Sequence, residues 1–285
     1  MKKRNLIYIA ISIVCVIAIA AGVYYQIFGQ DKDKPVNNNV LNTQVDDNQI
    51  DDPEKIKEEF NNLFTNTLYE QGYDISSIEK IAGLENQNIV YAAYNIREEK
   101  DGKYNVDINL PVFNIAGQLA TEFNNTTQSL FANKANDILN NASQYTIYNV
   151  DYVAYVNENI VSLVIKSILK EGNNAQRIIV QTYNYDVVTG QKVSLNEVLE
   201  AQGYSTKEVN QKIEEQVEEA SKQAEALSQA VSQTGQTIYK RDINNAMYVT
   251  DNVTNFFIGE NGAIYIVYAY GNSNFTSEMD IIKIS

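Results

Sequence analysis

Residues 145–190 read YTIYNVDYVAYVNENIVSLVIKSILKEGNNAQRIIVQTYNYDVVTG. Within them, two apolar runs at 145–156 and 160–169 flank Asn157-Glu158-Asn159. Runs rich in β-branched and aromatic residues that are separated by a short polar turn are typical of a β-hairpin. A third run at 177–188 has the same composition and predicts the next strand. This stretch therefore predicts an antiparallel sheet at the centre of the chain.

The segments on either side mix helical and strand patterns, without the regular alternation that βαβ units produce. This mixture predicts an α+β fold, with antiparallel sheets and packed helices. The expected elements are a helix from 53 to about 72, a hairpin of 89–96 and 104–110, a helix with the apolar stripe Ile115, Leu119, Phe123, Leu130, Ala135 and Ile138, a helical turn at 196–201, a helix at 205–233, and strands at 255–258, 263–270 and 279–284.

An uncharged apolar segment occupies residues 6–28 and follows three basic residues at positions 2–4. At a rise of ~1.5 Å per residue, such a helix spans the ~30 Å hydrocarbon core of a bilayer. Because basic residues stay on the cytoplasmic side, we expect residues 1–5 in the cytoplasm and the chain after residue 28 outside the cell. The small residues of Ala18-Ile19-Ala20 would also serve as a cleavage site, so the alternative is a signal peptide and secretion.

The external part divides into three expected regions. Residues 29–51 are polar and rich in Asn and Asp, which predicts a flexible stalk. Residues 52–170 are expected to form an N-terminal α+β subdomain, and residues 171–285 a C-terminal one. The chain is thus expected to be a single-pass membrane protein with a folded extracellular part.

Charge limits the partners of this external part. Without the three basic residues before the anchor, it carries 19 Lys and Arg against 36 Asp and Glu, a net charge of −17. Nucleic-acid binding depends on basic side chains that neutralise phosphates, so it is not expected. An acidic surface suits a cationic partner, although solubility outside the cell explains the same charge.

The composition also argues against catalysis. The chain has no histidine, and its only cysteine is Cys15, inside the expected membrane segment. Ser-His-Asp triads, zinc sites with histidine ligands and external thiolate chemistry therefore have no candidates. No glycine-rich phosphate-binding loop is present. We expect no enzyme activity, cofactor or metal, and only a pair of carboxylates brought together by folding would change this.

The stretch TYNYDVVTGQKVSLNEVL at 182–199 resembles a strand, Thr-Gly turn and helical turn found in one extracytoplasmic domain. That domain occurs in RsiV-type lysozyme-binding anti-sigma factors and beside some peptidoglycan deacetylases. The resemblance covers about residues 85–285. Two features depart from it. The loop at 171–176 reads EGNNAQ in place of a glycine-rich loop with histidine, and a cytoplasmic side of five residues is too short to clasp a sigma factor.

The resemblance implies an anchored, non-catalytic domain that binds an envelope-stress protein or a cell-wall component. Lysozyme is basic and would suit the acidic surface. The candidate binding residues are Tyr183, Tyr185, Asp186, Gly172, Asn173, Asn174 and Gln176. A purely structural role in a sheet hairpin is the alternative for each of them. The alternative function is a structural or assembly protein that associates through the helix at 205–233.

Overall fold

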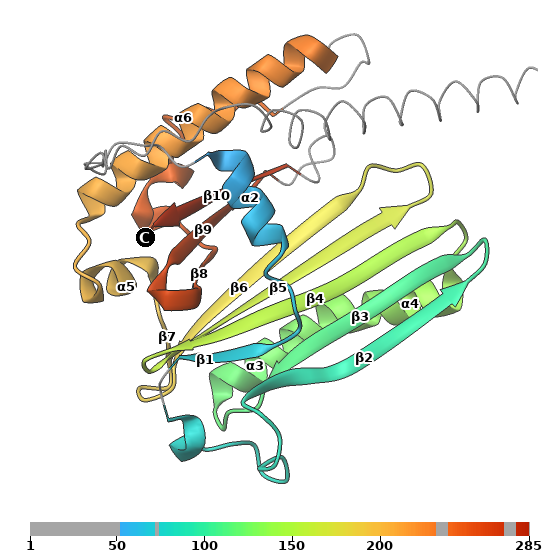
Figure 1. Cartoon of the computed structure of the whole chain (residues 1–285). Helices are drawn as coiled ribbons and strands as arrows, with labels where there is room; N and C mark the ends of the chain where they lie inside the picture. Colours follow the sequence, from blue (N-terminus) through green and yellow to red (C-terminus); the bar gives the residue numbers. More distant parts are fainter. Residues whose placement is uncertain (1–51, 72–73, 232–238, 271–277, 285) are drawn as a thin grey trace, which may run out of the picture. The chain divides into compact units, whose positions relative to one another are not determined.

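The computed structural model describes residues 52–71, 74–231, 239–270 and 278–284, with the backbone alone for 227–231 (Figure 1). These residues belong to one compact unit, residues 50–285. The helices are α2 (Pro53–Asn61), α3 (Gln118–Thr127), α4 (Asn133–Asn141), α5 (Leu195–Ala201) and α6 (Thr206–Val231), with a π-helix η2 (Gln128–Ala132) and 3₁₀ turns η1 (Ile75–Ser77), η4 (Ala246–Tyr248), η5 (Thr250–Asn252) and η6 (Glu260–Gly262). The strands are β1 (Leu68–Gln71), β2 (Val90–Lys100), β3 (Tyr104–Phe113), β4 (Thr146–Asn157), β5 (Ile160–Glu171), β6 (Arg177–Asp186), β7 (Gln191–Lys192), β8 (Phe256–Ile258), β9 (Ile264–Ala269) and β10 (Met279–Ile284).

The strands form a seven-stranded sheet, in the order β2-β3-β4-β5-β6-β7 with β1 beside β4, and a three-stranded sheet in the order β10-β9-β8. The α+β class is confirmed, as are the central hairpin of β4 and β5 and the strand β6 that follows it. The larger sheet is mixed, because β3 and β1 each run parallel to β4. The expected boundary at 170/171 falls within β5, so the sheet is continuous across it.

One edge of β4 is shared by two strands. β3 pairs with its first half, Thr146–Val150, and β1 pairs with its second half, Ala154–Asn157. The helix expected to reach residue 72 is wrong in this region, since α2 ends at Asn61 and the chain then becomes β1. The physical reason is tertiary: the second half of β4 has unpaired backbone groups where β3 diverges, and β1 satisfies them.

A helical layer of α3, η2 and α4 covers one face of the larger sheet (Figure 1). The helix expected here is interrupted by the π turn η2, which adds one residue to the helical period. The stripe is shifted as a result. Leu130, expected in the stripe, is 45% exposed, while Phe131 is 1% exposed and lies in the core.

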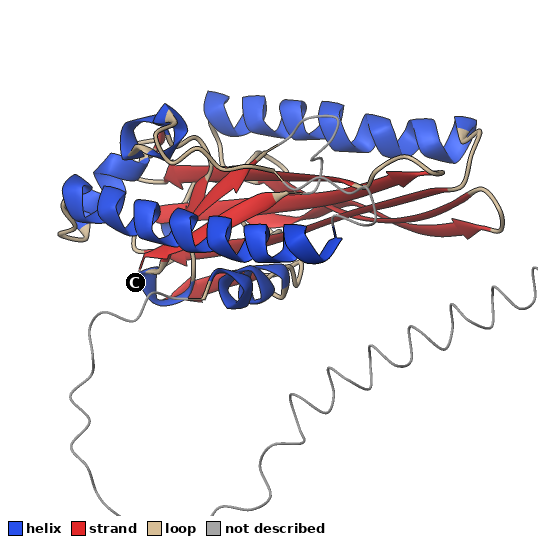
Figure 2. Cartoon of the chain, turned by 90° about the horizontal axis from the view of Figure 1, so that it is seen from above, coloured by secondary structure: helices blue, strands red, loops and turns tan. Residues whose placement is uncertain are grey.

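The opposite face of the larger sheet is covered in part by the three-stranded sheet and α2. Phe257, Tyr265 and Ile281 of the small sheet point toward the large one, and the alternate residues point toward α5 and α6. Figure 2 shows the strands between helices on two sides. The capping box expected at the start of α6 is confirmed, because Ser205 and Glu208 exchange backbone and side-chain hydrogen bonds.

The stripe expected on the helix at 205–233 is used within the chain over its first half. Val209, Ile213 and Val217 are at most 2% exposed, and they pack with β9 and β10. Leu227 and Val231, which continue the expected stripe, have side chains outside the described residues.

A buried polar joint holds the two sheets together. The Ser162 hydroxyl donates to Asn184 Oδ1 (2.6 Å) and accepts from the Ile258 backbone N–H (3.1 Å). The Asn184 amide donates to the Phe256 carbonyl (2.8 Å). Because β8 is only three residues long, these bonds fix its position on β5 and β6 where apolar packing alone would permit sliding.

The expected membrane segment at 6–28 and the expected stalk at 29–51 lie outside the described residues. Among the helices that are described, none has the length and apolarity needed to cross a bilayer.

Candidate binding face

Two of the expected binding residues, Tyr183 and Tyr185, lie on β6 and face the helical layer. Tyr185 is 3% exposed. Tyr183 packs on Phe123, with ring centroids 4.6 Å apart, and its hydroxyl donates to the Leu119 carbonyl (3.2 Å). Burial raises the pKa of Tyr183 to about 12. The structure thus places both tyrosines in the contact between sheet and helices.

Asp186 ends β6 and organises the turn that follows. Its Oδ1 accepts hydrogen bonds from the backbone N–H groups of Val188 (2.8 Å) and Thr189 (3.0 Å). Partial burial acts to raise the pKa of Asp186, but these hydrogen bonds outweigh burial and hold the pKa below its ordinary value. Gly190 completes the turn at φ +70°, a conformation that favours glycine.

The expected loop residues Gly172, Asn173, Asn174 and Gln176 lie at the other end of β6, between β5 and β6. At ~3.3 Å per residue, the length of β6 separates them from Tyr183, Tyr185 and Asp186 by roughly 25 Å. The expected residues are therefore not brought together into one site. The two groups are close in sequence but distant in space, because they lie at opposite ends of an extended strand.

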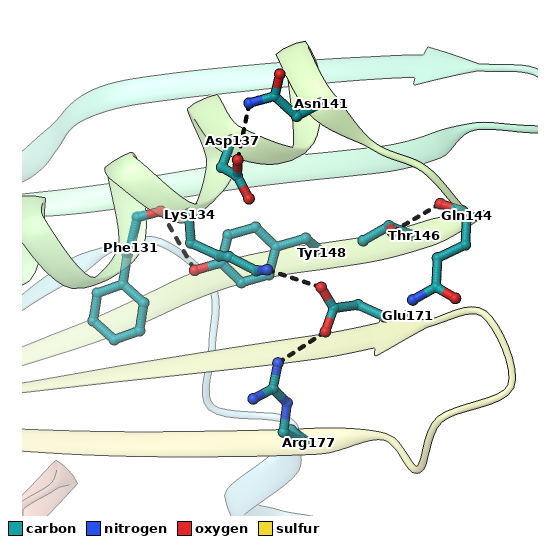
Figure 3. Close-up of polar contacts among 9 residues, drawn as sticks. All are labelled: Phe131, Lys134, Asp137, Asn141, Gln144, Thr146, Tyr148, Glu171 and Arg177. Atoms are coloured by element: carbon teal, nitrogen blue, oxygen red, sulfur yellow. Dashed lines mark hydrogen bonds and ion pairs between the residues drawn. The ribbon is translucent and has the colours of Figure 1, made fainter.

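An ion-pair cluster anchors this loop to the helical layer (Figure 3). Glu171 Oε1 lies 2.8 Å from Lys134 Nζ on α4, and Glu171 Oε2 lies 2.9 Å from Arg177 Nη2 on β6. The Gly172 N–H donates to the Tyr145 carbonyl (2.8 Å). Each charged side chain in the cluster has a partner inside the protein. Lys134, Glu171 and Arg177 therefore act as a structural clamp that holds the loop against the helical layer.

The clamp leads to a prediction for Gly172, which has φ +51°. Replacing it by Ala is expected to lower the free energy of unfolding by about 1–2 kcal/mol, because a side chain is disfavoured in this left-handed conformation. Urea denaturation measures the change. An added Cβ would also meet Gln144 Oε1 at 2.4 Å, so the same substitution in a Gln144→Ala background separates backbone strain from that clash. The prediction is contradicted if Gly172→Ala leaves stability unchanged both in the unaltered chain and in the Gln144→Ala background.

A different group of polar residues gathers on the face of the larger sheet that is opposite the helical layer. Asn95 of β2 is paired with Asn109 of β3, and its Nδ2 donates to Asn109 Oδ1 (3.0 Å). Asn109 Nδ2 donates in turn to Asp151 Oδ1 on β4 (3.1 Å). Asn66 Nδ2 donates to the same carboxylate oxygen (2.8 Å). These four residues form a hydrogen-bonded row, which we call the amide row.

Asn66 is placed by the split at the edge of β4. Its backbone N–H donates to the Tyr152 carbonyl (2.8 Å), and its Oδ1 accepts from the Tyr152 N–H (3.0 Å). Asn66 adopts φ +58°, which asparagine tolerates better than most residues. It therefore fills the gap between β1 and β3, and its side chain extends the amide row toward β1.

Tyr69 on β1 lies on the same face as this row, three residues after Asn66 and opposite Tyr155 of β4. Its ring stacks on Tyr155, with centroids 5.5 Å apart, and Thr65 Oγ1 lies 3.0 Å from its hydroxyl. Tyr69 is nevertheless 40% exposed. An aromatic ring held in a fixed orientation and partly open to solvent thus lies on the same face of the sheet as a row of polar side chains that is fixed by its own hydrogen bonds.

The charges around the amide row are of both signs. Arg97 Nε lies 3.5 Å from Asp107 Oδ2 on the β2 side, where both are solvent-accessible. Lys166 on β5 is opposite Asp151 and lies 4.1 Å from the centre of the Phe64 ring. Burial lowers the pKa of Lys166, and the nearby Asp151 carboxylate offsets part of that effect. The electrostatic potential at the amide row is therefore neither strongly positive nor strongly negative.

The amide row was missed by sequence reasoning. Its four members come from four segments of the chain. Only Asn109 shows a sequence pattern that indicates a solvent-facing position, because it alternates with apolar residues along β3. That alternation marks a solvent-facing side, but it does not indicate which other strands contribute to it. In the described part of the chain, no group of histidine, cysteine or acidic residues is arranged to hold a metal ion.

No family model matches the chain, and no curated protein matches it. One similar solved structure is a DUF3298 family protein from Pseudomonas aeruginosa PAO1, which is 17% identical, with 65% of this chain and 83% of that one covered and a TM-score of 0.37. Another is a DUF3298 family member from Bacteroides fragilis NCTC 9343, at 12% identity, 63% and 81% coverage and a TM-score of 0.30. These TM-scores are too low to establish a shared fold, so the resemblance to the RsiV-type domain stays a prediction.

Proposed function

We propose that this chain is a single-pass membrane protein whose extracellular α+β domain is a non-catalytic binding or sensing module of the cell envelope. The amide row is the observation that carries the proposal. Its side chains are already oriented by hydrogen bonds to one another, and Asn95 in the row and Tyr69 on the same face are exposed. Fixed, solvent-facing donors and acceptors lose little entropy when a ligand replaces water, and this favours binding.

The proposed partner is a protein or a cell-wall ligand. The net charge of −17 on the external part supports a cationic partner such as lysozyme, because complementary charge speeds encounter. The alternative, assembly through residues 205–233, has less support. Val209, Ile213 and Val217 are already buried inside the chain, so this part of the stripe is not available to a partner helix.

The binding proposal is tested by retention of the full chain on immobilised lysozyme and on insoluble peptidoglycan. We expect retention on at least one of them. Asn95→Lys, which places a long cation in the amide row, is expected to reduce retention at least about tenfold, equivalent to about 1.4 kcal/mol. Val188→Lys is the matched control, because it adds the same side chain at a position that is 70% exposed in the turn after β6.

Two results would contradict the binding proposal. The first is that neither material retains the unaltered chain. The second is that Asn95→Lys and Val188→Lys bind equally well, which would place the binding surface elsewhere.

The proposed location has its own test. Protease added to intact cells is expected to digest the region after residue 51, because the basic residues at positions 2–4 keep the N-terminus inside. Digestion only after lysis would contradict an extracellular domain. A chain that is released into the medium would favour the signal-peptide alternative.

A further inference from the structure

We infer that the amide row and Tyr69 form a binding site for an unbranched oligosaccharide of about three sugar rings. This inference rests on the proposed function and names the ligand class of the same face. It follows from three properties of the site: the kind of polar groups, the position of the aromatic ring, and the length of the surface they cover.

The polar groups match the hydrogen-bonding needs of sugar hydroxyls. A hydroxyl group donates one hydrogen bond and accepts others, and an asparagine amide does both in one plane. Each amide of the row uses part of its capacity within the row: Asn95 donates one bond through Nδ2, and Asn109 accepts that bond and donates another to Asp151. The second N–H of each amide and the second oxygen of Asp151 are therefore left for pairs of neighbouring hydroxyls.

The aromatic ring supplies the apolar half of sugar recognition. The C–H groups on one face of a pyranose ring are apolar, and they pack on a flat aromatic surface. Tyr69 is held by its stacking on Tyr155 and by the contact of its hydroxyl with Thr65, so little freedom remains to be lost on binding. At 40% exposed, it is one of two tyrosines among the exposed large apolar residues of the described chain, and the other, Tyr145, lies at the far end of β4.

The dimensions decide the length of the ligand. Asn95 is one strand away from Asn109 of β3, and β1 continues along the same edge of β4 as β3, with Tyr69 opposite Tyr155, four residues beyond Asp151. With strands ~4.8 Å apart and ~3.3 Å per residue, the distance from Asn95 to Tyr69 is roughly 15 Å. That is about the length of three linked sugar rings.

A folded protein fits this part of the face less well. Protein interfaces bury apolar residues at the centre of the patch and keep polar residues at the rim. Here the centre consists of Asn109, Asn66 and the Asp151 carboxylate. Burying it under an apolar protein surface would leave the second N–H of each amide and the second oxygen of Asp151 without partners, at a cost of about 1–3 kcal/mol each.

The test is calorimetric titration of the full chain, in a detergent without a sugar head group, with chitotriose and with cellotriose. We expect at least one trisaccharide to bind. Tyr69→Ala and Asn95→Ala are each expected to raise the Kd at least about tenfold. Tyr145→Ala is the matched control, because it removes a tyrosine that is 42% exposed elsewhere, and it is expected to change the Kd by less than about twofold.

Thermal melting of each variant shows whether the fold is retained. Asn95 is exposed and contributes one side-chain bond, so its variant remains interpretable if Tyr69→Ala unfolds. Absence of binding to both trisaccharides at millimolar concentration overturns the inference, and so does binding that neither variant weakens. Retention on lysozyme without trisaccharide binding also overturns it, while leaving the proposed binding function intact.

Discussion

Replacing Asp280 by Asn is expected to lower the free energy of unfolding by about 3–5 kcal/mol, because it removes the paired carboxylate of a buried guanidinium and leaves it only the more distant Glu278 carboxylate, at 3.8 Å. Asp280 on β10 receives two hydrogen bonds from Arg241, from Nε to Oδ2 (2.7 Å) and from Nη2 to Oδ1 (2.6 Å). The side chains of Arg241 and Asp280 are only 5% and 6% exposed.

The Asp280 carboxylate also supports a chain of tyrosines. The Tyr270 hydroxyl donates to Asp280 Oδ2, and the Tyr248 hydroxyl lies 2.9 Å from that of Tyr270. Burial and the Asp280 carboxylate together raise the pKa of Tyr270, so it stays protonated and able to donate. Burial by itself lowers the pKa of Arg241, but its bonds to Asp280 reverse this and raise it. Loss of the carboxylate therefore disturbs three neighbours at once.

Chemical denaturation of Asp280→Asn measures this loss. The control is Asp107→Asn, which removes the exposed partner of Arg97 and is expected to cost less than about 1 kcal/mol, because water screens that pair. If Asp280→Asn costs no more than Asp107→Asn, the buried pair does not stabilise the fold as we describe.

Replacing Phe257 by Ala is the second large effect that we expect, at about 3–5 kcal/mol of unfolding free energy. Phe257 on β8 is 0% exposed and lies where the two sheets meet. Its ring stacks on Tyr265 with centroids 4.7 Å apart, and lies 6.1 Å from Phe60 of α2 and 6.3 Å from Tyr155 of β4. Truncation leaves a cavity that these rigid rings cannot fill, so both lost burial and lost contacts contribute.

Melting temperature and denaturation midpoint both report on the Phe257→Ala variant. Val188→Ala is a suitable comparison, because Val188 is 70% exposed and its truncation is expected to change stability by less than about 0.5 kcal/mol. A Phe257→Ala loss below about 1 kcal/mol would mean that the two sheets do not depend on this contact.

Local patterns predicted much of the secondary structure correctly. The hairpin of β2 and β3, the hairpin of β4 and β5, and the capping box of α6 are each encoded by residues close together in sequence. Two helical predictions were wrong for reasons that no local pattern contains. Residues 68–71 pair with β4 instead of extending α2, and the π turn before α4 exposes Leu130.

The candidate site was less predictable than the fold. The resemblance to the RsiV-type domain implied Tyr183 and Tyr185 as binding residues, but Tyr185 is buried and Tyr183 packs on Phe113 and Phe123. One strand exposes alternate residues on opposite faces, and the strand alone does not indicate which face is covered. Here the helical layer covers the face that carries the tyrosines.

Composition and periodicity over a few residues were enough to predict the α+β class, the order of most elements and the absence of histidine chemistry. No local pattern predicts that Asn66, Asn95, Asn109 and Asp151 meet, because the pairing of β3 with β4 and the split edge of β4 bring them together. Asn95 and Asn109 share a local hairpin, whereas Asn66 and Asp151 come from segments that are distant from it in the chain. The contacts that join Asn66 and Asp151 to the hairpin therefore had to be seen in the folded protein.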